Sequence, residues 1–396
     1  MSRSHPTFIS LFSGCGGLDV GFARQGFRCV GAFENNATAA RVHKKNLDGP
    51  VWEEDLATIS ATSLPRADVL IAGPPCQGFS TIGRRDPSDP RNQLLLRTAT
   101  LATELAPAVV IIENVTGVVA GKLSVFWNET KRHLETAGYS TQDIRFDSSS
   151  LGVPQIRFRQ LLIAWTTAFD GRIELASASS RTLRDALRGV KCLPNHDPKW
   201  LEPLSDGEKI AKRIRQRQKL CNVRSSERSV HTWEIPEVFG KTNTFERRLL
   251  ETLLVLRRRD RRRDFGDADP VSARTLYTEI RRPVSSTLSG LTRKGYIRRI
   301  GQHYDLTDTF NGKYRRLAWD HPASTVDTRF GEPRYFLHPV ENRGFSVREA
   351  ARIQGFADDF IFDGTLGEQF KMVGNAVPPP VSEAIAAFVR KYILSK

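Results

Sequence analysis

Short apolar runs alternate with helical patterns through the first 165 residues of this 396-residue chain, and this alternation limits the possible folds more than any other feature. Short apolar runs are typical of buried strands, and the segments between them have the periodicity of helices. The expected strands are Phe8–Phe12, Cys29–Glu34, Asp68–Gly73, Ala108–Asn114 and Arg159–Trp165, and the clearest expected helix is Asn92–Ala106. This order predicts a parallel α/β sheet with helices on both faces.

The alternation ends near residue 166, and a second pattern follows. Residues 166–242 hold few periodic segments and are expected to form loops with short elements. Residues 243–310 show three helical patterns and then two short strands, which is typical of a winged helix-turn-helix whose third helix enters a groove of DNA. We therefore expect a Rossmann-like α/β domain with a mixed parallel sheet at 1–165, completed by residues 371–396, and a smaller domain at 166–370 that contains the winged helix.

Basic residues are concentrated in one part of the chain. Between Ser205 and Asp320 there are 27 Lys and Arg against 15 Asp and Glu, whereas the rest of the chain has 32 against 29. Most of the net charge of +15 therefore falls in the second domain. Such a segment indicates a surface that binds a polyanion such as nucleic acid, although a surface kept charged for solubility would show the same excess.

The cysteines and the N-terminus indicate a cytoplasmic protein. The cysteines are Cys15, Cys29, Cys76, Cys192 and Cys221. They are odd in number and lack paired spacing, which argues against a disulfide framework or a metal site. No apolar run reaches the roughly 20 residues of a membrane helix, and the N-terminus lacks the apolar segment of a signal peptide. We expect a monomer with no membrane contact, no metal and no obligate protein partner.

One cysteine follows two prolines at the end of an expected strand, in the stretch AGPPCQGFS at Ala72–Ser80. Structural cysteines more often lie inside apolar runs, and prolines stiffen a loop. From these residues alone, Cys76 is either a reactive thiol or an ordinary loop cysteine.

A glycine-rich turn and two acids suggest a cofactor that carries a nucleoside. Gly14, Gly16 and Gly17 of LFSGCGG follow the first strand, where glycines let a backbone approach a ligand closely. Glu34 ends the second strand, where an acid commonly binds ribose hydroxyls, and Asp55 could accept from an adenine amine. Each acid taken alone is more often a surface carboxylate.

Further polar groups lie near the ends of later strands. Glu113 follows five apolar residues, where an unpaired charge would be costly, and is a candidate acid beside the cofactor. Gln155, Arg157 and Arg159 alternate in QIRFR and would point the same way on a strand. Two guanidinium groups and an amide aimed at one place suit a phosphate or a carbonyl oxygen, although an exposed edge strand can show the same pattern.

Together these stretches resemble the DNA (cytosine-5)-methyltransferase family, which uses S-adenosylmethionine. The matching stretches, in the family's order, are LFSGCGG, GPPCQGFS, ENV, QIRFR, SVREAARIQGFADDF and GNAVPP. They cover most of residues 8–165 and 335–380. The resemblance implies that the first domain is catalytic and binds the cofactor, and that target recognition lies in the stretch between, which matches no fixed pattern.

The resemblance implies a catalytic set of Cys76, Glu113, Arg157 and Arg159. Cys76 would add to C6 of cytosine as a nucleophile, so that C5 can take the methyl group. Glu113 would hold and protonate N3, and Arg159 would hold O2. Arg157 would contact a flanking phosphate or the cysteine loop. The target base would have to flip out of the duplex to react.

Two sets of binding residues complete the expectation. The resemblance assigns S-adenosylmethionine to Phe12, Ser13, Gly14, Cys15, Gly16, Gly17, Glu34, Asp55, Gly73, Pro74, Asn375 and Val377. Double-stranded DNA would meet Gln77 and Ser80 in the cysteine loop, Ser285, Ser286, Ser289 and Arg293 on the third helix of the winged segment, and Arg298 and Arg299 on its wing.

Three positions depart from the family's pattern. Ser10 stands where an Asp usually precedes Leu-Phe, and Ala357 replaces a common Pro. Asn35 stands where some members have an aromatic residue that stacks on adenine. The changes at Ser10 and Asn35 could weaken cofactor affinity, and none of the three touches the expected catalytic set.

Three other functions remain as alternatives to DNA modification. A tRNA cytosine-5 methyltransferase would share the core, but such relatives generally differ after PPCQ and lack a large basic insert. A repressor with an inactive core would have no need of Cys76, Glu113 and both arginines. A dinucleotide-dependent oxidoreductase explains the glycine-rich turn but not the cysteine, ENV or GNAVPP. The sequence favours a site-specific DNA (cytosine-5)-methyltransferase, most commonly found as a bacterial restriction-modification enzyme.

Overall fold

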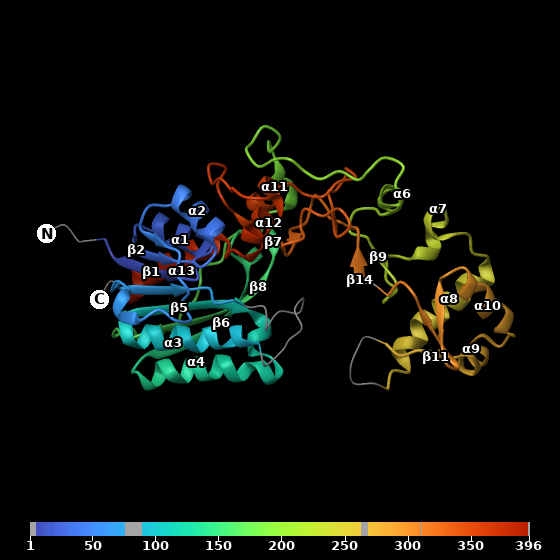
Figure 1. Cartoon of the computed structure of the whole chain (residues 1–396), viewed down its shortest axis with the longest axis horizontal. Coiled ribbons are helices and arrows are strands. Elements are labelled where there is room, and N and C mark those ends of the chain that lie inside the picture. The colour runs from blue at the N-terminus through green and yellow to red at the C-terminus, as the bar shows by residue number, and fades with distance from the viewer. Residues whose placement is uncertain (1–4, 76–88, 263–267, 310, 395–396) are drawn as a thin grey trace. The chain divides into compact units, whose positions relative to one another are not determined.

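The computed structural model describes residues 5–75, 89–262, 268–309 and 311–394. Its internal contacts divide the chain into two compact units, whose elements are labelled in Figure 1. The first unit comprises Met1–Asp197, Trp319–Arg329 and Ser346–Lys396, and the second comprises Pro198–Ala318 and Phe330–Phe345.

Residues 166–197 and 346–370 pack in the first unit, whereas the sequence places them in the second domain. Buried Arg348 shows one way in which they are held together. Its guanidinium group donates to three backbone carbonyl groups, those of Pro194, Ala357 and Phe360. These contacts join backbone groups outside the central sheet, and such contacts leave no periodic pattern in a sequence.

A seven-stranded mixed sheet forms the centre of the first unit, with the order β3-β2-β1-β4-β5-β8-β6. Its strands are β1 (Thr7–Leu11), β2 (Arg28–Phe33), β3 (Val51–Trp52), β4 (Val69–Ala72), β5 (Val109–Val115), β6 (Ser140–Asp147) and β8 (Phe158–Trp165). Strands β1 to β5 pair in parallel, and β8 is antiparallel to both β5 and β6. The expected mixed sheet is confirmed. The prediction of a purely parallel sheet is wrong at the edge formed by β8 and β6. Strand β6 leads to β8 without the helical crossover that parallel strands need.

Helices cover both faces of this sheet (Figure 1). One face carries α3 (Gln93–Leu105) and α4 (Ser124–Thr136), and the other carries α1 (Gly17–Arg24) and α13 (Pro379–Phe388). Because side chains alternate along a strand, Leu70 packs with α3 and α4, whereas its neighbour Ile71 packs with α1 and α13. The two ends of the chain therefore share one core.

Smaller elements complete the first unit. The helices are α2 (Ala37–Asn46), α5 (Leu183–Leu187), α11 (Val347–Gln354), α12 (Leu366–Asn375) and a π-helix at Val389–Ile393, and the strands β7 (Gln155–Ile156) and β16 (Ala323–Ser324) form a two-stranded sheet. Short 3-10 helices lie at Ala61–Ser63, Pro90–Asn92, Thr116–Val119, Gly121–Leu123 and Ser148–Ser150.

The strand order of the central sheet reverses at β1. Strand β2 lies on one side of β1, and β4, which follows β3 in the chain, lies on the other. The glycine-rich turn leaves the carboxyl end of β1, and the GPP sequence leaves the carboxyl end of β4. In open α/β sheets ligands bind in the crevice outside such a reversal. The fold therefore brings the glycine-rich turn and the GPP sequence to the position where a ligand is expected.

The second unit contains small sheets and short elements. Outside its winged segment they are α6 (Asp206–Arg213), β9 (Lys219–Cys221), β10 (Ser229–Val230), a 3-10 helix at Thr232–Glu234, α7 (Pro236–Phe239), β14 (Asn311–Lys313), β15 (Arg315–Arg316) and β17 (Phe336–Leu337). Strands β10, β9 and β14 form one sheet, and β15 pairs with β17. Across the described ranges of both units, no helix is long and apolar enough to cross a membrane.

The segment expected to be a winged helix has the predicted order of elements. They are α8 (Thr244–Arg259), β11 (Val271–Ser272), α9 (Ala273–Ile280), α10 (Ser285–Arg293), β12 (Ile297–Ile300) and β13 (His303–Leu306). Strand β13 pairs antiparallel with both β11 and β12. A capping box of Asn243 and Glu246 starts α8. Whether the segment acts as a winged helix stays a prediction.

Candidate active site

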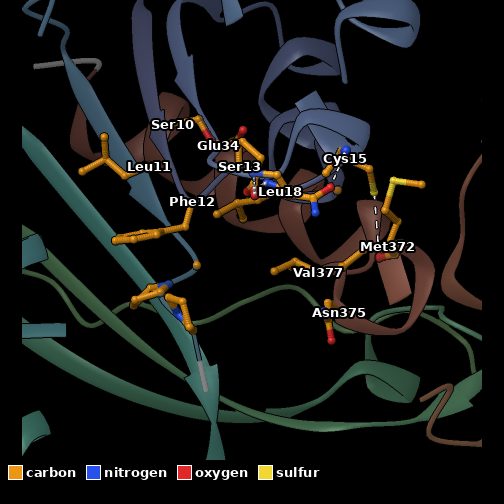
Figure 2. Close-up of a pocket in the computed structure, with 18 of the residues that line it drawn as sticks. Ser10, Leu11, Phe12, Ser13, Cys15, Leu18, Glu34, Met372, Asn375 and Val377 are labelled. Atoms are coloured by element: carbon orange, nitrogen blue, oxygen red, sulfur yellow. Dashed lines mark hydrogen bonds between the residues drawn. The ribbon is translucent and has the colours of Figure 1, made fainter. Parts of the chain in front are cut away.

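A pocket of about 360 Å³ lies at the carboxyl ends of β1 and β4 in the first unit (Figure 2). Every expected cofactor residue except Gly16 lines it: Phe12, Ser13, Gly14, Cys15, Gly17, Glu34, Asp55, Gly73, Pro74, Asn375 and Val377. Glu113, Arg157 and Arg159 line it too. The pocket therefore unites stretches from both ends of the chain.

The three glycines of the turn differ in what they allow. Gly14 has a φ of 57°, and a Cβ atom there would meet no atom of the described residues within 4 Å, so this residue keeps the pocket wall open. A Cβ atom on Gly17 would lie 2.5 Å from the carbonyl oxygen of Val377. Gly16 has a φ of 95°, and its Cβ atom would lie 2.9 Å from Cδ2 of His43. Gly14 thus leaves space on the pocket side of the turn, whereas Gly16 and Gly17 allow close packing of neighbouring chain segments.

Glu34 holds the turn against the end of β2. One of its carboxylate oxygens accepts from the backbone N–H of Gly14 at 2.9 Å, and the other accepts from that of Asn36 at 2.8 Å. A carboxylate oxygen can accept a second hydrogen bond, so Glu34 can still receive a ligand hydroxyl from the pocket. Asp55 lines the same pocket and accepts from the backbone N–H of Ala57 at 3.0 Å.

Two residues of the turn have properties that recur at ligand sites. Phe12 has a φ of 54°, a left-handed conformation that is strained for a residue other than glycine. The hydroxyl of Ser13 is buried and has no hydrogen-bond partner among the described residues. Buried hydroxyls are normally bonded, so Ser13 offers a polar atom to whatever fills the pocket.

Cys15 lies in the same wall but is poorly suited to nucleophilic attack. Burial raises the pKa of its thiol to about 12, and the nearby charges of Asp19 and Glu34 act in the same direction. Its Sγ lies 3.9 Å from the carbonyl oxygen of Met372, a contact drawn in Figure 2. Because the thiolate is the nucleophilic form, the structure assigns Cys15 to packing.

A buried polar network adjoins the turn and joins Ser10 on β1, Asp19 on α1 and His43 on α2. The Oγ of Ser10 donates to Asp19 at 3.0 Å, and the other carboxyl oxygen of Asp19 lies 2.9 Å from Nε2 of His43. Each of the three residues is 1% exposed. At residue 10 the sequence lacks the expected Asp, and Asp19 places a carboxyl group directly beside it. The ring of His43 in turn packs against Gly16.

Glu113 and Arg159 form a charged pair in the pocket wall. The Oε1 of Glu113 lies 2.9 Å from Nε of Arg159, and the two side chains are 10% and 13% exposed. They come from the neighbouring antiparallel strands β5 and β8. The same oxygen makes no well-aligned hydrogen bond among the described residues, so the contact is an ion pair. Such a pair presents an acid and a cation to one small ligand.

Gln155 and Arg157 do not share a target with Arg159, although the alternation in QIRFR predicts that they do. The guanidinium group of Arg157 is buried and donates at 3.1 Å to three carbonyl oxygens, those of Val326, Gly374 and Ala376. Gln155 is buried beside it and accepts from the backbone N–H of Val326 at 2.9 Å. The strand is interrupted at Arg157, between β7 and β8, so the alternation does not continue to Arg159. The contacts give Arg157 a positioning role.

Asn114 links the acid's strand to the cysteine stretch. Its buried side-chain amide donates to the carbonyl oxygen of Pro74 at 3.2 Å. Pro74 and Pro75 line the pocket and lead directly into Cys76. Cys76, Gln77 and Ser80 lie outside the described residues, so their roles stay predictions.

Several positioning residues escaped the sequence reasoning, namely Asn114, Gln354 and the Asp19–His43 pair. Gln354 is buried, contacts Gln155 and donates to the carbonyl oxygen of Val373. Asn114 lies in ENV and Gln354 in SVREAARIQGFADDF, two of the stretches that match the family. Their polar side chains at fixed positions in these stretches were the signal that could have identified them. Within the described part of the chain, no group of three His, Cys, Asp or Glu residues could hold a metal ion.

Comparison with known proteins identifies the family. The family model described as C-5 cytosine-specific DNA methylase matches residues 6–391. The chain belongs to this family. The protein is therefore a DNA (cytosine-5)-methyltransferase, as the ordered stretches of its sequence predict.

Individual relatives are similar over nearly the whole chain. The type II methyltransferase M.AgeI of Thalassovita gelatinovora is 28% identical, over 96% of this chain and 98% of that protein. The type II methyltransferase M.XorII of Xanthomonas oryzae pv. oryzae is 28% identical, over 99% of this chain and 86% of that protein. A solved structure of Entamoeba histolytica methyltransferase EhMeth has a TM-score of 0.56 and 17% identity, and covers 99% of this chain. At that identity it supports the fold alone.

Proposed function

We propose that this methyltransferase transfers a methyl group from S-adenosylmethionine to C5 of a cytosine that has been flipped out of duplex DNA. The observation that carries the proposal is that one pocket holds both Glu34 and Gly14 and the Glu113–Arg159 pair. A nucleoside-binding wall and an acid–cation pair in one pocket suit two molecules that must react with each other.

The described residues fit S-adenosylmethionine, which would supply an electrophilic methyl group. Glu34 stands where the ribose hydroxyls of a nucleoside bind in such folds, and the open backbone at Gly14 leaves room for close approach. The hydroxyl of Ser13, which has no hydrogen-bond partner among the described residues, offers a further hydrogen bond. Asp55 lies in the pocket lining and can accept from an adenine amine.

Cys76 would activate the cytosine ring. C5 of cytosine is a weak nucleophile because the ring is aromatic, and addition of a thiolate at C6 removes that aromaticity. After C5 has gained the methyl group, loss of the C5 proton and release of Cys76 restore the ring. Burial raises the pKa of both Cys15 and Cys29 to about 12, which makes either a poor substitute for Cys76.

Glu113 and Arg159 would hold the base during this addition. A proton shared between Glu113 and N3 lets the ring accept the electrons of the thiolate, and the guanidinium group of Arg159 can donate to O2. Their ion pair places both groups before the base arrives, which reduces reorganisation during the reaction. The base must leave the stack to reach them.

The relatives suggest the setting of this activity. M.AgeI and M.XorII are named type II methyltransferases, so we propose that this enzyme modifies DNA within a restriction-modification system. The concentration of positive charge in the second unit supports a polyanionic substrate.

Transfer of a tritiated methyl group to duplex DNA and to tRNA tests the proposal directly. The wild type should label duplex DNA, and Cys76→Ala should label neither substrate. Cys192→Ala, which removes an exposed cysteine, is the matched control and should keep full activity. Duplex DNA with 5-fluorocytosine at the target should trap a covalent adduct, because no proton can leave C5. Activity of Cys76→Ala near wild type would refute this mechanism, and bisulfite sequencing of host DNA would identify the modified word.

A further inference from the structure

We infer that the exposed side of α10 in the second unit contacts the bases of duplex DNA, and that Arg299 on β12 contacts its backbone. The inference rests on the proposed function, because it assumes that duplex DNA is the substrate. It adds the surface that meets the duplex.

Helix α10 has one polar side and one apolar side. Its exposed residues are Ser285, Ser286, Ser289, Thr292 and Arg293. At 3.6 residues per turn they fall within about a third of the helix circumference. Leu288 and Leu291 lie on the opposite side and are fully buried. One coherent face of the helix is thus available to a partner.

The helix is fixed firmly enough to present that face in one orientation. Leu288 and Leu291 pack into the core that also holds Leu249 of α8. At the end of α10, the ammonium group of Lys294 lies 2.7 Å from the carboxylate of Glu246. A reading side chain needs such a support, because discrimination between bases depends on hydrogen-bond geometry.

The chemistry of the face suits a groove of DNA better than a protein surface. Protein interfaces are centred on aromatic and large apolar side chains, and none is present at these positions. Hydroxyl groups can donate to or accept from base edges, and an arginine can pair with guanine. The hydroxyls of Ser285 and Ser286 make no hydrogen bond within the described structure, so their donors are available. Small side chains also allow a helix to come close to the bases.

The two arginines of β12 differ in their contacts. Arg298 lies 3.0 Å from Asp305, and Asp305 also pairs with the buried Arg257 of α8. Arg298 therefore helps to hold the hairpin to the helices. Arg299 uses its Nε to bond the carbonyl oxygen of Gly301 at 2.8 Å, and a guanidinium group has four further donors. Arg299 is thus the better candidate for a phosphate contact.

A charge reversal at Arg293, measured in the full-length enzyme, tests the base contact. The matched control is Arg248→Glu, which makes the same charge change at an exposed position on α8. Arg293→Glu should weaken binding to the modified DNA word about 5- to 150-fold more than Arg248→Glu does, with a smaller difference on a scrambled duplex. Arg293→Ala, which adds no negative charge, should also weaken binding to the modified word more than binding to the scrambled duplex.

The backbone contact predicts a different signature. Arg299→Ala should weaken binding to all duplexes alike and reduce the slope of log K against log[salt] by ~0.9. Equal affinities of Arg293→Glu and Arg248→Glu on both duplexes, or an unchanged slope in Arg299→Ala, would overturn the corresponding contact. If the wild type methylates duplex DNA in that case, only this inference fails. If the wild type neither binds nor methylates duplex DNA, the proposed function fails with it.

Discussion

The polar residues that we assign to catalysis in the first unit and to DNA contact in the second differ in how exposed they are. In the first unit Glu113, Arg157 and Arg159 are largely buried and bonded to one another or to the backbone. In the second, Arg293 and Arg299 are exposed. A group that reacts must be held in one geometry, whereas a side chain that contacts a duplex must be reachable. Substitutions in the first unit should therefore change catalysis and cofactor binding, and those in the second should change DNA affinity and its salt dependence.

Glu113→Gln should give the largest effect in this set. The amide keeps the size of the acid but cannot share a proton with N3 of the base, and general acid–base catalysis contributes about 10²–10⁴-fold. We expect a loss of that size in kcat with little change in S-adenosylmethionine affinity, measured by single-turnover methyl transfer and calorimetry. Glu104→Gln, at an exposed position on α3, is the control. Lost cofactor affinity with an unchanged kcat would instead make Glu113 a cofactor residue.

Arg157→Lys should give the second-largest effect. It tests whether a buried arginine supports the site by holding backbone carbonyl groups in place. An ammonium group cannot reproduce the fork that reaches the carbonyl oxygens of Val326, Gly374 and Ala376. Hydrogen bonds to charged groups contribute about 1.5–3 kcal/mol each, so we expect the first unit to lose about 3 kcal/mol of unfolding free energy. S-adenosylmethionine affinity should fall as the C-terminal lining loosens. Denaturation followed by cofactor titration measures both, with the exposed Arg172→Lys as control. Wild-type stability would return Arg157 to the role of a substrate contact.

Arg257→Met tests whether a buried arginine likewise has a structural role in the second unit. Arg257 is buried and pairs with Asp305, which keeps its contact with Arg298 in the variant. Because one partner remains, we expect a loss of about 2 kcal/mol of stability, at the level of one charged hydrogen bond. DNA affinity should fall while S-adenosylmethionine affinity stays at the wild-type value. The neighbouring exposed Arg258→Met is the control. A fall in cofactor affinity would show that the units are not functionally separable.

The sequence predicted the elements and site residues of the two units to different extents, and the difference has a physical reason. In the first unit the apolar runs predict five of the seven strands of the central sheet and miss β3 and β6. The stretches LFSGCGG, ENV and GNAVPP predict the pocket, because a fixed reaction demands fixed residue types. In the second unit the three helical patterns and two short strands of residues 243–310 predict the elements. The DNA contacts expected there rest on the order of the elements and not on a fixed motif, because a recognition surface varies with the word it reads.

The sequence failed where a side chain binds distant backbone. Arg157 and Arg348 reach carbonyl oxygens of residues that lie far away in the chain or carry no periodic pattern. An alternation of polar residues predicts direction only within an unbroken strand, and the interruption at Arg157 removed that basis. The Asp19–His43 pair was missed for a related reason, since its members lie on two helices and meet only through packing.

Asp19→Asn should give the smallest effect, and it tests whether the buried network serves the cofactor turn. The amide can accept one of the two hydrogen bonds that Asp19 now makes with Ser10 and His43, so about one hydrogen bond, typically 0.5–1.5 kcal/mol, is lost. We expect the Kd for S-adenosylmethionine to rise about 2- to 12-fold with kcat unchanged. The network touches the cofactor turn through Gly16, whereas Glu113 is held by Arg159. Asp48→Asn, exposed just after α2, is the control. The double variant Ser10→Asp with Asp19→Ser moves the carboxyl group to the position usual in the family and should recover part of the affinity. A variant that loses kcat at an unchanged Kd would show that the network supports the chemistry rather than the turn.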